Sequence, residues 1–215
     1  MAFVFNGSSA YLESTTVPVS TYPLTISARF SPSNAGVGAN QVIAALCGST
    51  GIHTHQLRLG TLGQIQAVSS EGGTVGQASV GGVTNNLTYT ATAIFTSATQ
   101  RRIFDGANGA NDTTNVTPTG LNRLNVGARY DSGALGSFFP GTICDVAIWN
   151  AALTDEEAIV LARGTPLMVR PGNLMFYAPL IRPTIDLKGG PSLAATVASV
   201  TPHLRARYPG RPKIA

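Results

Sequence analysis

Apolar and polar residues alternate along most of this chain. Over residues 24–30, Leu, Ile, Ala and Phe alternate with Thr, Ser and Arg, and residues 87–95 largely repeat the pattern with threonine as the polar partner. A period of two predicts strands with one buried face, and threonine suits the other face because β-branched side chains pack well on a pleated surface. The same pattern, or a short apolar run, predicts further strands at residues 3–5, 10–12, 41–47, 57–59, 64–69, 101–104, 124–126, 142–149, 174–180 and 193–200.

Turn signals separate these predicted strands. The pairs Asn6-Gly7 and Asp105-Gly106 are typical of tight turns, and glycines gather at residues 48–51 and 72–82. We interpret residues 72–82 as a flexible loop, because their glycines do not lie between a strand and a helix as those of a phosphate-binding loop do. Many short strands at this spacing predict an all-β fold: a two-sheet antiparallel sandwich of the jelly-roll type.

One short helix is predicted near residues 154–163. Thr154 is followed three positions later by Glu157, the spacing of a capping box, in which each side chain bonds the backbone N–H of the other residue. Acidic residues at 155 and 156 suit the positive end of a helix dipole. Gly164 and Pro166 then predict that the helix ends.

Composition places the chain among globular proteins. Hydrophobic residues make up 43% of it, enough to bury a core, and charged residues only 11%. No run of eighteen apolar residues occurs, so no membrane-spanning helix is expected. The first residues lack the basic and apolar regions of a signal peptide, so we expect a soluble protein made in a cytoplasm.

Charge is distributed unevenly along the chain. Residues 1–162 contain six arginines and nine acidic residues, whereas residues 163–215 contain eight basic residues and one acidic residue. We therefore predict a sandwich domain at 1–181 and a basic extension at 182–215 that mediates assembly, with a solvated, frayed terminus as the alternative. A strand at 193–200 would pair with a sheet edge of its own domain or of a partner. The expected contacts of the arm are Arg205, Arg207, Tyr208, Arg211 and Lys213.

Residues 139–159 carry a family resemblance. The stretch reads FPGTICDVAIWNAALTDEEAI, and the opening residues 3–12 read FVFNGSSAYL. Both resemble laminin-G-like domains of the concanavalin-A-like lectin/glucanase superfamily, with Cys144 shifting the acid by one place. The similarity spans residues 2 to about 181 and implies the sandwich fold. Trp149, the only tryptophan, is expected to be a core or edge anchor rather than a sugar-stacking platform. It does not fix the function, because the superfamily includes lectins, adhesion modules, hydrolases and structural proteins.

Enzymatic activity is not expected. Glycoside hydrolysis needs two carboxylates on one concave face, and the hydrolases of this superfamily carry an E-x-D-x-x-E strand. No such string occurs here, and two of the four glutamates, Glu156 and Glu157, belong to the predicted helix start.

Four residues between positions 105 and 112 are candidate calcium ligands. Asp105, Asn108, Asn111 and Asp112 offer the oxygen ligands that Ca²⁺ prefers, but Asn, Asp and Gly also make ordinary turns. No cofactor other than such a calcium ion is expected, and Asp131 and Asp145 are further candidates.

The histidine pair and the cysteine pair each have two interpretations. His53 and His55 would present two imidazoles on one strand face for a transition metal, without a visible third ligand, and the nearby Gly51 favours a loop tip. Cys47 and Cys144 are either two buried thiols, the favoured interpretation, or a pair bridged by the fold.

Two functions remain open. The first is a structural virion protein on the particle surface of a bacteriophage, a capsid decoration or tail accessory protein made in the host cytoplasm, with a major capsid or tail protein or a second copy of itself as partner. The second is a carbohydrate-binding module for a host-surface glycan. No membrane partner is expected, and four basic charges with one aromatic residue make nucleic acid a poor match. Candidate glycan contacts are the aromatic residues Tyr11, Tyr22, Tyr130, Phe138 and Phe139.

Overall fold

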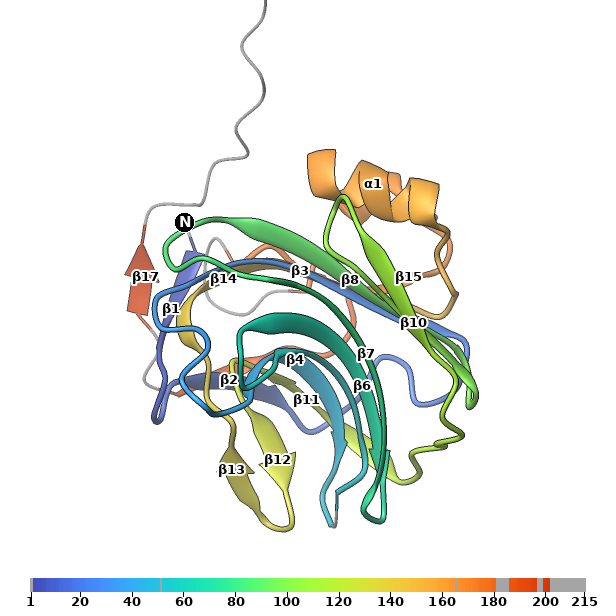
Figure 1. Ribbon diagram of the computed structural model, residues 1–215, viewed down its shortest axis with the longest axis horizontal. Coiled ribbons are helices and arrows are strands. Elements are labelled where there is room, and N and C mark those ends of the chain that lie inside the picture. The colour runs from blue at the N-terminus through green and yellow to red at the C-terminus, as the bar shows by residue number, and fades with distance from the viewer. Residues whose placement is uncertain (1, 51, 165, 181–185, 197–198, 202–215) are drawn as a thin grey trace, which may run out of the picture.

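The computed structural model describes residues 2–50, 52–164, 166–180, 186–196 and 199–201. Two antiparallel sheets pack face to face (Figure 1). The first sheet runs in the order β10 (Gly109–Asp112), β9 (Gln100–Phe104), β8 (Tyr89–Ser97), β3 (Leu24–Pro32), β14 (Pro140–Trp149), β1 (Ala2–Asn6) and β17 (Ser199–Thr201), and β15 (Leu174–Ala178) pairs with β14. The second sheet runs in the order β16 (Ala194–Thr196), β2 (Tyr11–Ser14), β11 (Leu121–Val126), β4 (Gln41–Gly48), β5 (Thr54–Leu59), β6 (Gln64–Glu71) and β7 (Thr74–Gly82).

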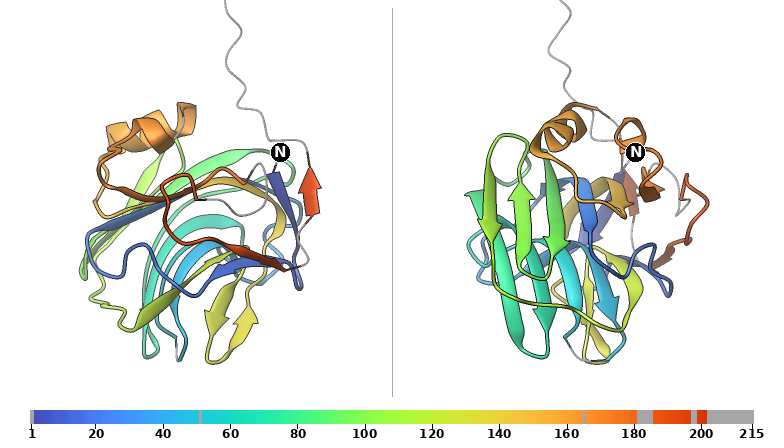
Figure 2. Two further views of the ribbon diagram at one scale, coloured as in Figure 1. Left: turned by 180° about the vertical axis from the view of Figure 1, so that it is seen from behind. Right: turned by 90° about the vertical axis from the view of Figure 1, so that its right-hand side faces the viewer.

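Three smaller elements complete the described fold. The hairpin of β12 (Arg129–Asp131) and β13 (Ala134–Gly136) lies beside the seven-stranded sheet, whose strands curl toward it (Figure 1). The helix α1 (Asp155–Arg163) and the 3-10 turn η1 (Pro166–Met168) lie at the opposite end of the molecule, beside the eight-stranded sheet (Figure 2). The predicted all-β sandwich with one short helix is thereby confirmed. No helix in these ranges is long and apolar enough to cross a membrane.

The main core fills the space between the two sheets. Strand β3 shows how the sequence builds it: Leu24, Ile26, Ala28 and Phe30 are fully buried in this core. The threonine and serine between them are buried as well, because α1 and the residues around it cover part of the other face of this sheet. Thr25, for example, donates its hydroxyl to the carbonyl of Ala151.

Strand β14 departs from the expected alternation. The sequence pattern places Ile143 on the same face as Ala147 and Trp149, but Ile143 belongs to the main core and the other two to a second cluster beneath α1. The register to β3 shifts between Cys144 and Ala147, and Asp145 between them has a φ of 52°. This bulge reverses the alternation, because one extra residue sends every later side chain to the opposite face.

The predicted helix and its capping box are confirmed. The Thr154 hydroxyl accepts the N–H of Glu157, and the Glu157 carboxylate accepts the N–H of Thr154. Asp155 in the first turn also binds Arg102 of β9, which fastens the helix to the eight-stranded sheet. The chain leaves α1 at Gly164 in an extended conformation.

Replacing Thr154 by Ala is expected to destabilise the protein by about 0.5–2 kcal/mol, because the N–H of Glu157 loses its acceptor. Urea denaturation of Thr154→Ala and of the native chain measures the difference. Thr154→Ser keeps the hydroxyl and serves as the control. A Thr154→Ala midpoint equal to that of the native chain would contradict the importance of this cap.

The interpretation of residues 72–82 as a flexible loop is wrong. Gly72 and Gly73 form the turn, both with positive φ, but the residues after them form β7 and pair with β6 along its length. A glycine is required inside this strand, because a Cβ on Gly76 would lie 1.8 Å from the Arg101 guanidinium. A glycine has no side chain that would mark a buried or an exposed face, so the sequence pattern does not reveal this strand.

Part of the C-terminal extension belongs to the sandwich. The single strand expected at 193–200 is two strands: β16 pairs with β2 of one sheet and β17 with β1 of the other. Leu193 is 2% exposed and lies in the main core. Asp186 accepts the backbone N–H groups of Tyr177, Lys188 and Gly190. These contacts correct the expectation that everything from about residue 183 serves assembly, and of the two strand-pairing alternatives the structure has the pairing within the chain's own domain. The arm residues Arg205, Arg207, Tyr208, Arg211 and Lys213 lie outside the described residues.

Candidate functional site

The candidate site lies on the face of the seven-stranded sheet that is turned away from the core. This face, called the concave face below, curls toward the β12–β13 hairpin (Figure 1). Strand register places one row of side chains across it: Asn125 pairs with Ala45, Ala45 with Gln56, Gln56 with Val68 and Val68 with Gln77. Amide side chains therefore stand in the centre of a face where a purely structural sheet would carry apolar residues or solvent-exposed charges.

Arg58 stands in the neighbouring row of the concave face. It is only 7% exposed, and its guanidinium donates to two amide oxygens: Nε to Gln66 Oε1 at 2.9 Å and Nη2 to Gln77 Oε1 at 2.8 Å. Within the described ranges it forms no ion pair with a carboxylate. Burial, with the nearby Arg129 charge adding to it, lowers the pKa of Arg58 to about 10.

Two further arginines border the same face. Arg123 of β11 pairs with Glu13, and Arg129 of β12 pairs with Asp131 at 2.6 Å. The Arg123 guanidinium also stacks 4.4 Å from the centre of the Tyr130 ring. Arg58, Arg123 and Arg129 are called the arginine cluster below.

Several buried polar atoms on the concave face have no hydrogen-bond partner. Within the described ranges these are Gln56 Oε1, Asn125 Oδ1 and Nδ2, Arg123 Nε and Arg129 Nε. An unpaired buried polar group costs about 1–3 kcal/mol, so folded proteins keep few of them. Both acceptors and donors are left open here, which is the pattern that a ligand bearing hydroxyl groups satisfies.

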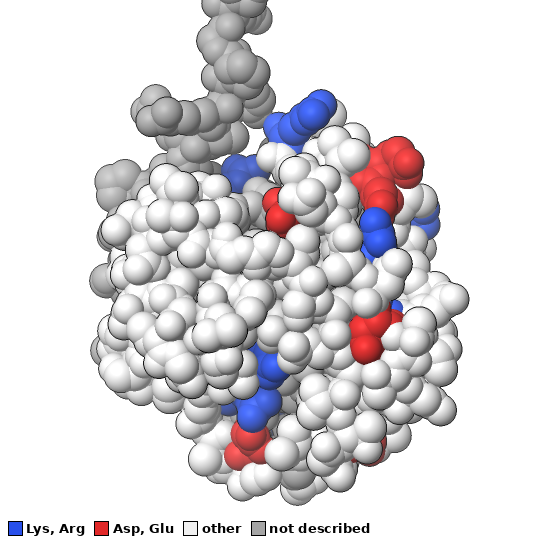
Figure 3. All heavy atoms as spheres, in the orientation of Figure 1, with Lys and Arg blue, Asp and Glu red and all other residues white. Residues whose placement is uncertain are grey.

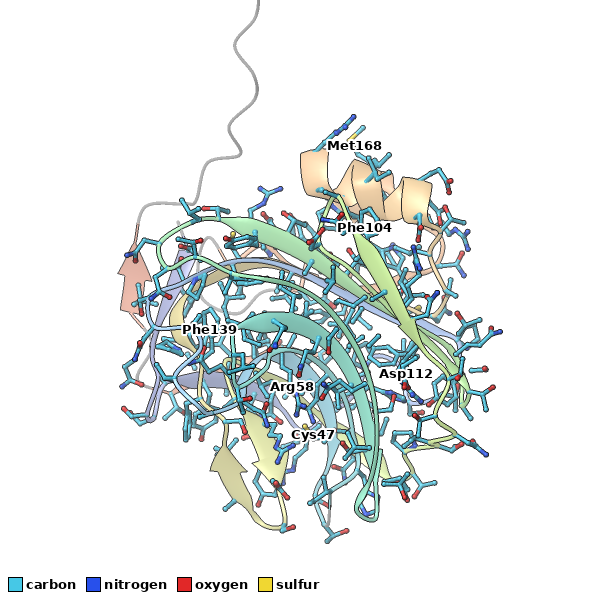
Figure 4. The ribbon with its side chains drawn as sticks, in the orientation of Figure 1. Cys47, Arg58, Phe104, Asp112, Phe139 and Met168 are labelled. Atoms are coloured by element: carbon cyan, nitrogen blue, oxygen red, sulfur yellow. The ribbon has the colours of Figure 1, made fainter. Side chains whose placement is uncertain are left out.

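The figures show the position of this cluster. Figure 4 places Arg58 and Cys47 on the curled sheet, on the side facing the β12–β13 hairpin. In the same orientation, Figure 3 shows basic atoms with acidic atoms directly below them in this region, on a face that is otherwise largely uncharged.

The predicted aromatic contacts lie in different environments. Tyr11 and Tyr130 are half-buried; Tyr11 shares the concave face with Glu13 by strand alternation, and Tyr130 packs on the residues of β4. Phe138 is half-buried beside the hairpin. Phe139 is fully buried against Phe30 in the core, so its prediction as a glycan contact is wrong. The hydroxyl of Tyr22 donates to the Val116 carbonyl, at a distance of 2.6 Å.

The predicted calcium ligands do not converge. Asp105 accepts the N–H groups of Ala107 and Asn108 at the tip of the β9–β10 hairpin, which is turn chemistry. Asn111 accepts from Arg102, and Asp112 pairs with the buried Arg101. Asp112 lies three residues along the strand from Gly109 at the hairpin tip, about 10 Å away. The described residues contain no group of three or more His, Cys, Asp or Glu that would hold a metal ion.

The two histidines have separate environments. His53 contacts the Glu71 carboxylate at 2.7 Å, whereas His55 is buried between Tyr22 and Phe95 and contacts Ser69 Oγ at 3.0 Å. They do not form the metal pair that was the less favoured alternative, and the favoured loop tip does not hold for His55, which lies in β5. Burial, with the Arg101 charge adding to it, lowers the pKa of His55 to about 3.

Acid is expected to destabilise the protein through His55. In the unfolded chain a histidine binds a proton below about pH 6.5, whereas the folded state keeps His55 neutral down to about pH 3. The unfolded state therefore gains protons in this window, and the free energy of unfolding falls by about 2 kcal/mol between pH 6.5 and pH 4.5. Urea denaturation across this range measures the slope. His55→Gln cannot titrate and should flatten the slope; equal slopes in both proteins would contradict the buried neutral histidine.

Both cysteines are free and buried, as the favoured interpretation predicts. Cys47 lies on the concave face under Tyr130, and burial raises its pKa to about 12. Cys144 lies in the eight-stranded sheet, where burial and the Asp145 charge raise its pKa. Neither thiol is prepared for nucleophilic chemistry, since that requires a lowered pKa.

Where a described carboxyl group has a clearly shifted pKa, the shift opposes acid catalysis. Three described carboxyl groups, those of Glu71, Asp112 and Glu157, have clearly shifted pKa values. Burial raises each pKa, but hydrogen bonds and neighbouring cationic groups outweigh it and leave the pKa lowered. A glycosidase general acid needs the opposite shift. Asp131 pairs with Arg129, and Asp145 contacts Arg29 and Tyr177.

Sequence reasoning missed the residues of the concave face. The sequence pointed to these residues in one way only: Arg58 stands between Leu57 and Leu59, and Asn125 stands between Leu124 and Val126. Alternation assigns both to an outer face, where a polar residue normally meets water. Only the strand register shows that they share one face, and only the structure shows that both side chains are buried there.

Known proteins share this architecture. No curated protein matches the chain. Among solved structures, the CBM40 of the Ruminococcus gnavus IT-sialidase bound to alpha2,3 sialyllactose is 15% identical, with a TM-score of 0.57 over 66% of this chain and 84% of that one. The native heptameric SAP-like pentraxin from Limulus polyphemus is 12% identical, with a TM-score of 0.63 over 90% of this chain and 93% of that one. Domains LG4-5 of the mouse laminin alpha1 chain are 14% identical, with a TM-score of 0.53 over 68% of this chain and 40% of that one.

These likenesses show the fold, and the family follows from a sequence match over most of the chain. The model of the family Laminin_G_3 matches residues 6–158, which run from β1 into α1 and include the whole β12–β13 hairpin. Strands β2 to β14 of the sandwich thus lie inside the matched region. The chain belongs to this laminin-G-like family of the concanavalin A-like lectin/glucanases superfamily.

Proposed function

We propose that this protein is a non-catalytic carbohydrate-binding module that takes its ligand on the concave face. The observation that carries the proposal is the set of buried polar atoms without partners at Gln56, Asn125, Arg123 and Arg129. Within the described part of the fold, these atoms lie on one face, which also carries the exposed Gln77 and Ser79 of β7.

Sugar hydroxyls match this set of atoms. A hydroxyl donates one hydrogen bond and accepts others, so a single sugar ring satisfies the open amide oxygens and the open N–H groups together. Asn125 leaves both its oxygen and its nitrogen open, which a ligand that only accepts or only donates cannot satisfy. The solved CBM40 structure with sialyllactose bound is a relative in fold that carries a sugar, which supports the same class of ligand.

Aromatic stacking adds a second contact type. Tyr130 packs against the cluster of Val42, Ala45 and Cys47, and Ala45 pairs with both Asn125 and Gln56. Its ring, with Arg123 stacked against it, therefore lies close to the open amides. A ligand that reaches these amides displaces this stacked pair or inserts beside it, so the hairpin forms one wall of the site.

The proposal is tested by glycan binding of the native chain and of Gln56→Met. A glycan array, run with and without calcium, identifies the ligand, and calorimetry with that glycan gives the dissociation constant. Gln56→Met removes an acceptor that has no partner, together with the hydrogen bond that Gln56 Nε2 donates to Thr54 Oγ1, so it should lower the melting temperature only slightly while weakening binding at least tenfold.

Gln100→Met is the matched control. It makes the same chemical change at an exposed position of β9 in the other sheet, and its affinity should equal that of the native chain. A native chain that binds no glycan on the array, or a Gln56→Met variant with native affinity, would contradict the proposal.

The virion role stays a prediction, and we propose it as the setting in which such a module works. It is supported by the low charge content of the chain and by the mostly uncharged surface in Figure 3, which resembles the composition expected of a particle surface. In this setting the partner is a major capsid or tail protein. Because β16 and β17 belong to the sandwich, residues 202–215 are the part of the basic arm that we propose docks on this partner. Cosedimentation of the purified chain with phage particles tests this; a chain that stays in the supernatant with every particle offered would contradict it.

A further inference from the structure

The arginine cluster has more positive charge than its carboxylate partners neutralise. Glu13 pairs with Arg123 and Asp131 pairs with Arg129, which leaves Arg58 without an acidic partner among the residues that the structure describes. Three arginines and two carboxylates leave one positive charge on the concave face. A buried charge without a partner is costly, so proteins usually neutralise it.

The surroundings of Arg58 are neutral, and they use only part of its hydrogen-bonding capacity. Its two recorded acceptors are the amide oxygens of Gln66 and Gln77, which bind Nε and Nη2. A guanidinium has five N–H groups, so the Nη1 amino group remains available. The lowered pKa of Arg58 has the same origin: burial and the charge of Arg129 both disfavour the cation, and an anion bound here would reverse that effect.

We infer that the ligand of the concave face is an acidic sugar whose carboxylate binds Arg58. The inference rests on the proposed function and names the ligand class of the same site. One uncompensated positive charge matches one carboxylate, and the planar guanidinium matches its two oxygens. The sugar ring then lies over the row of amide side chains next to Arg58, with its hydroxyls on the open groups of Gln56 and Asn125.

Exposure indicates where the carboxylate enters. Gln77, which holds Arg58 from β7, is exposed, and so is Ser79, which lies across β6 from Arg58. The ion pairs of Arg123 and Arg129 belong to the side of the face near the β12–β13 hairpin. The acid is therefore expected to enter along β7, past the Gln77 side chain, and the ring then reaches the open amides beside the stacked Tyr130 and Arg123.

The experiment compares acidic sugars with their methyl esters. Calorimetry is run with trigalacturonic acid and its methyl ester, and with 3′-sialyllactose and its methyl ester, so that uronic acids and sialic acids are tested separately. Esterification removes the charge and leaves the ring hydroxyls in place. For at least one of the two sugars the free acid should bind at least tenfold more tightly than the ester, and the difference should shrink at high salt.

Variants of Arg58 assign the effect to that side chain. Arg58→Met should remove most of the preference for the acid over the ester, and Arg58→Lys should keep part of that preference. Arg163→Met, an exposed arginine at the end of α1, is the matched control and should keep the full preference.

The outcomes separate the two claims. Equal affinity of acid and ester for the native chain would overturn the acidic ligand while leaving the carbohydrate-binding module intact. An acid preference that survives in folded Arg58→Met would overturn the role of Arg58. The ester comparison on the native chain needs no variant, so it decides the ligand class even where a substitution unfolds the protein.

Discussion

A chain ending at residue 185 is expected to lose most of its stability. The deletion removes Leu193 from the main core, strand β16 from the edge of β2 and the Asp186 carboxylate from the Tyr177 N–H. Loss of a buried leucine alone costs about 2–5 kcal/mol, and a domain of this kind has only about 5–15 kcal/mol in total. Thermal denaturation followed by circular dichroism measures the effect.

A chain ending at residue 201 is the matched control for this deletion. It keeps every contact of residues 186–196 and the β17 pairing with β1, and should melt near the temperature of the full chain. Leu193→Ala tests the central contact without deletion and should cost about 2–5 kcal/mol. Equal melting of the two shortened chains would contradict the assignment of residues 186–201 to the sandwich.

Replacing Trp149 by Ala is expected to destabilise the protein by about 3–5 kcal/mol. Trp149 is fully buried in the cluster beneath α1, and its Nε1–H donates to the Val169 carbonyl at 2.9 Å. The substitution removes the ring and leaves that carbonyl without its donor. Both α1 and η1 therefore lose packing against the sheet.

Two further measurements separate the contributions of Trp149. Trp149→Phe keeps an aromatic ring but not the donor, so it should cost less than Trp149→Ala, by urea denaturation of both variants. Because Trp149 lies on the eight-stranded sheet, folded Trp149→Phe should bind glycan with native affinity. An unchanged midpoint in Trp149→Ala, or lost binding in folded Trp149→Phe, would contradict its place as a core residue far from the site.

Local patterns predicted the parts of the fold that local chemistry determines. The alternation at Leu24–Pro32 and the Thr154–Glu157 capping box both appear in the structure, because each depends on residues close in sequence. The bulge at Asp145 and the strand around Gly76 were missed, because each depends on a distant contact. Gly76 is required by Arg101 from another strand, and the positive φ of Asp145 occurs where β14 changes register against β3.

The candidate site was harder to predict than the fold. Aromatic residues were sought by their chemistry, and one of them, Phe139, serves the core instead. The amide and arginine side chains of the concave face come from β4 to β7, β11 and the β12–β13 hairpin, so no stretch of sequence contains them together. Each one taken alone has the pattern of an ordinary outward-facing residue on a strand.

Chemical-shift mapping by NMR tests the concave-face site most directly. An ¹⁵N-labelled chain is titrated with the glycan that binds best on the array, and backbone and side-chain amide signals are followed. The account predicts that the side-chain amides of Gln56, Gln77 and Asn125 shift, together with the backbone of β12, while α1 and the eight-stranded sheet stay unchanged. Shifts confined to the β9–β10 hairpin tip around Asp105 and Asn108, with the concave face unmoved, would contradict it.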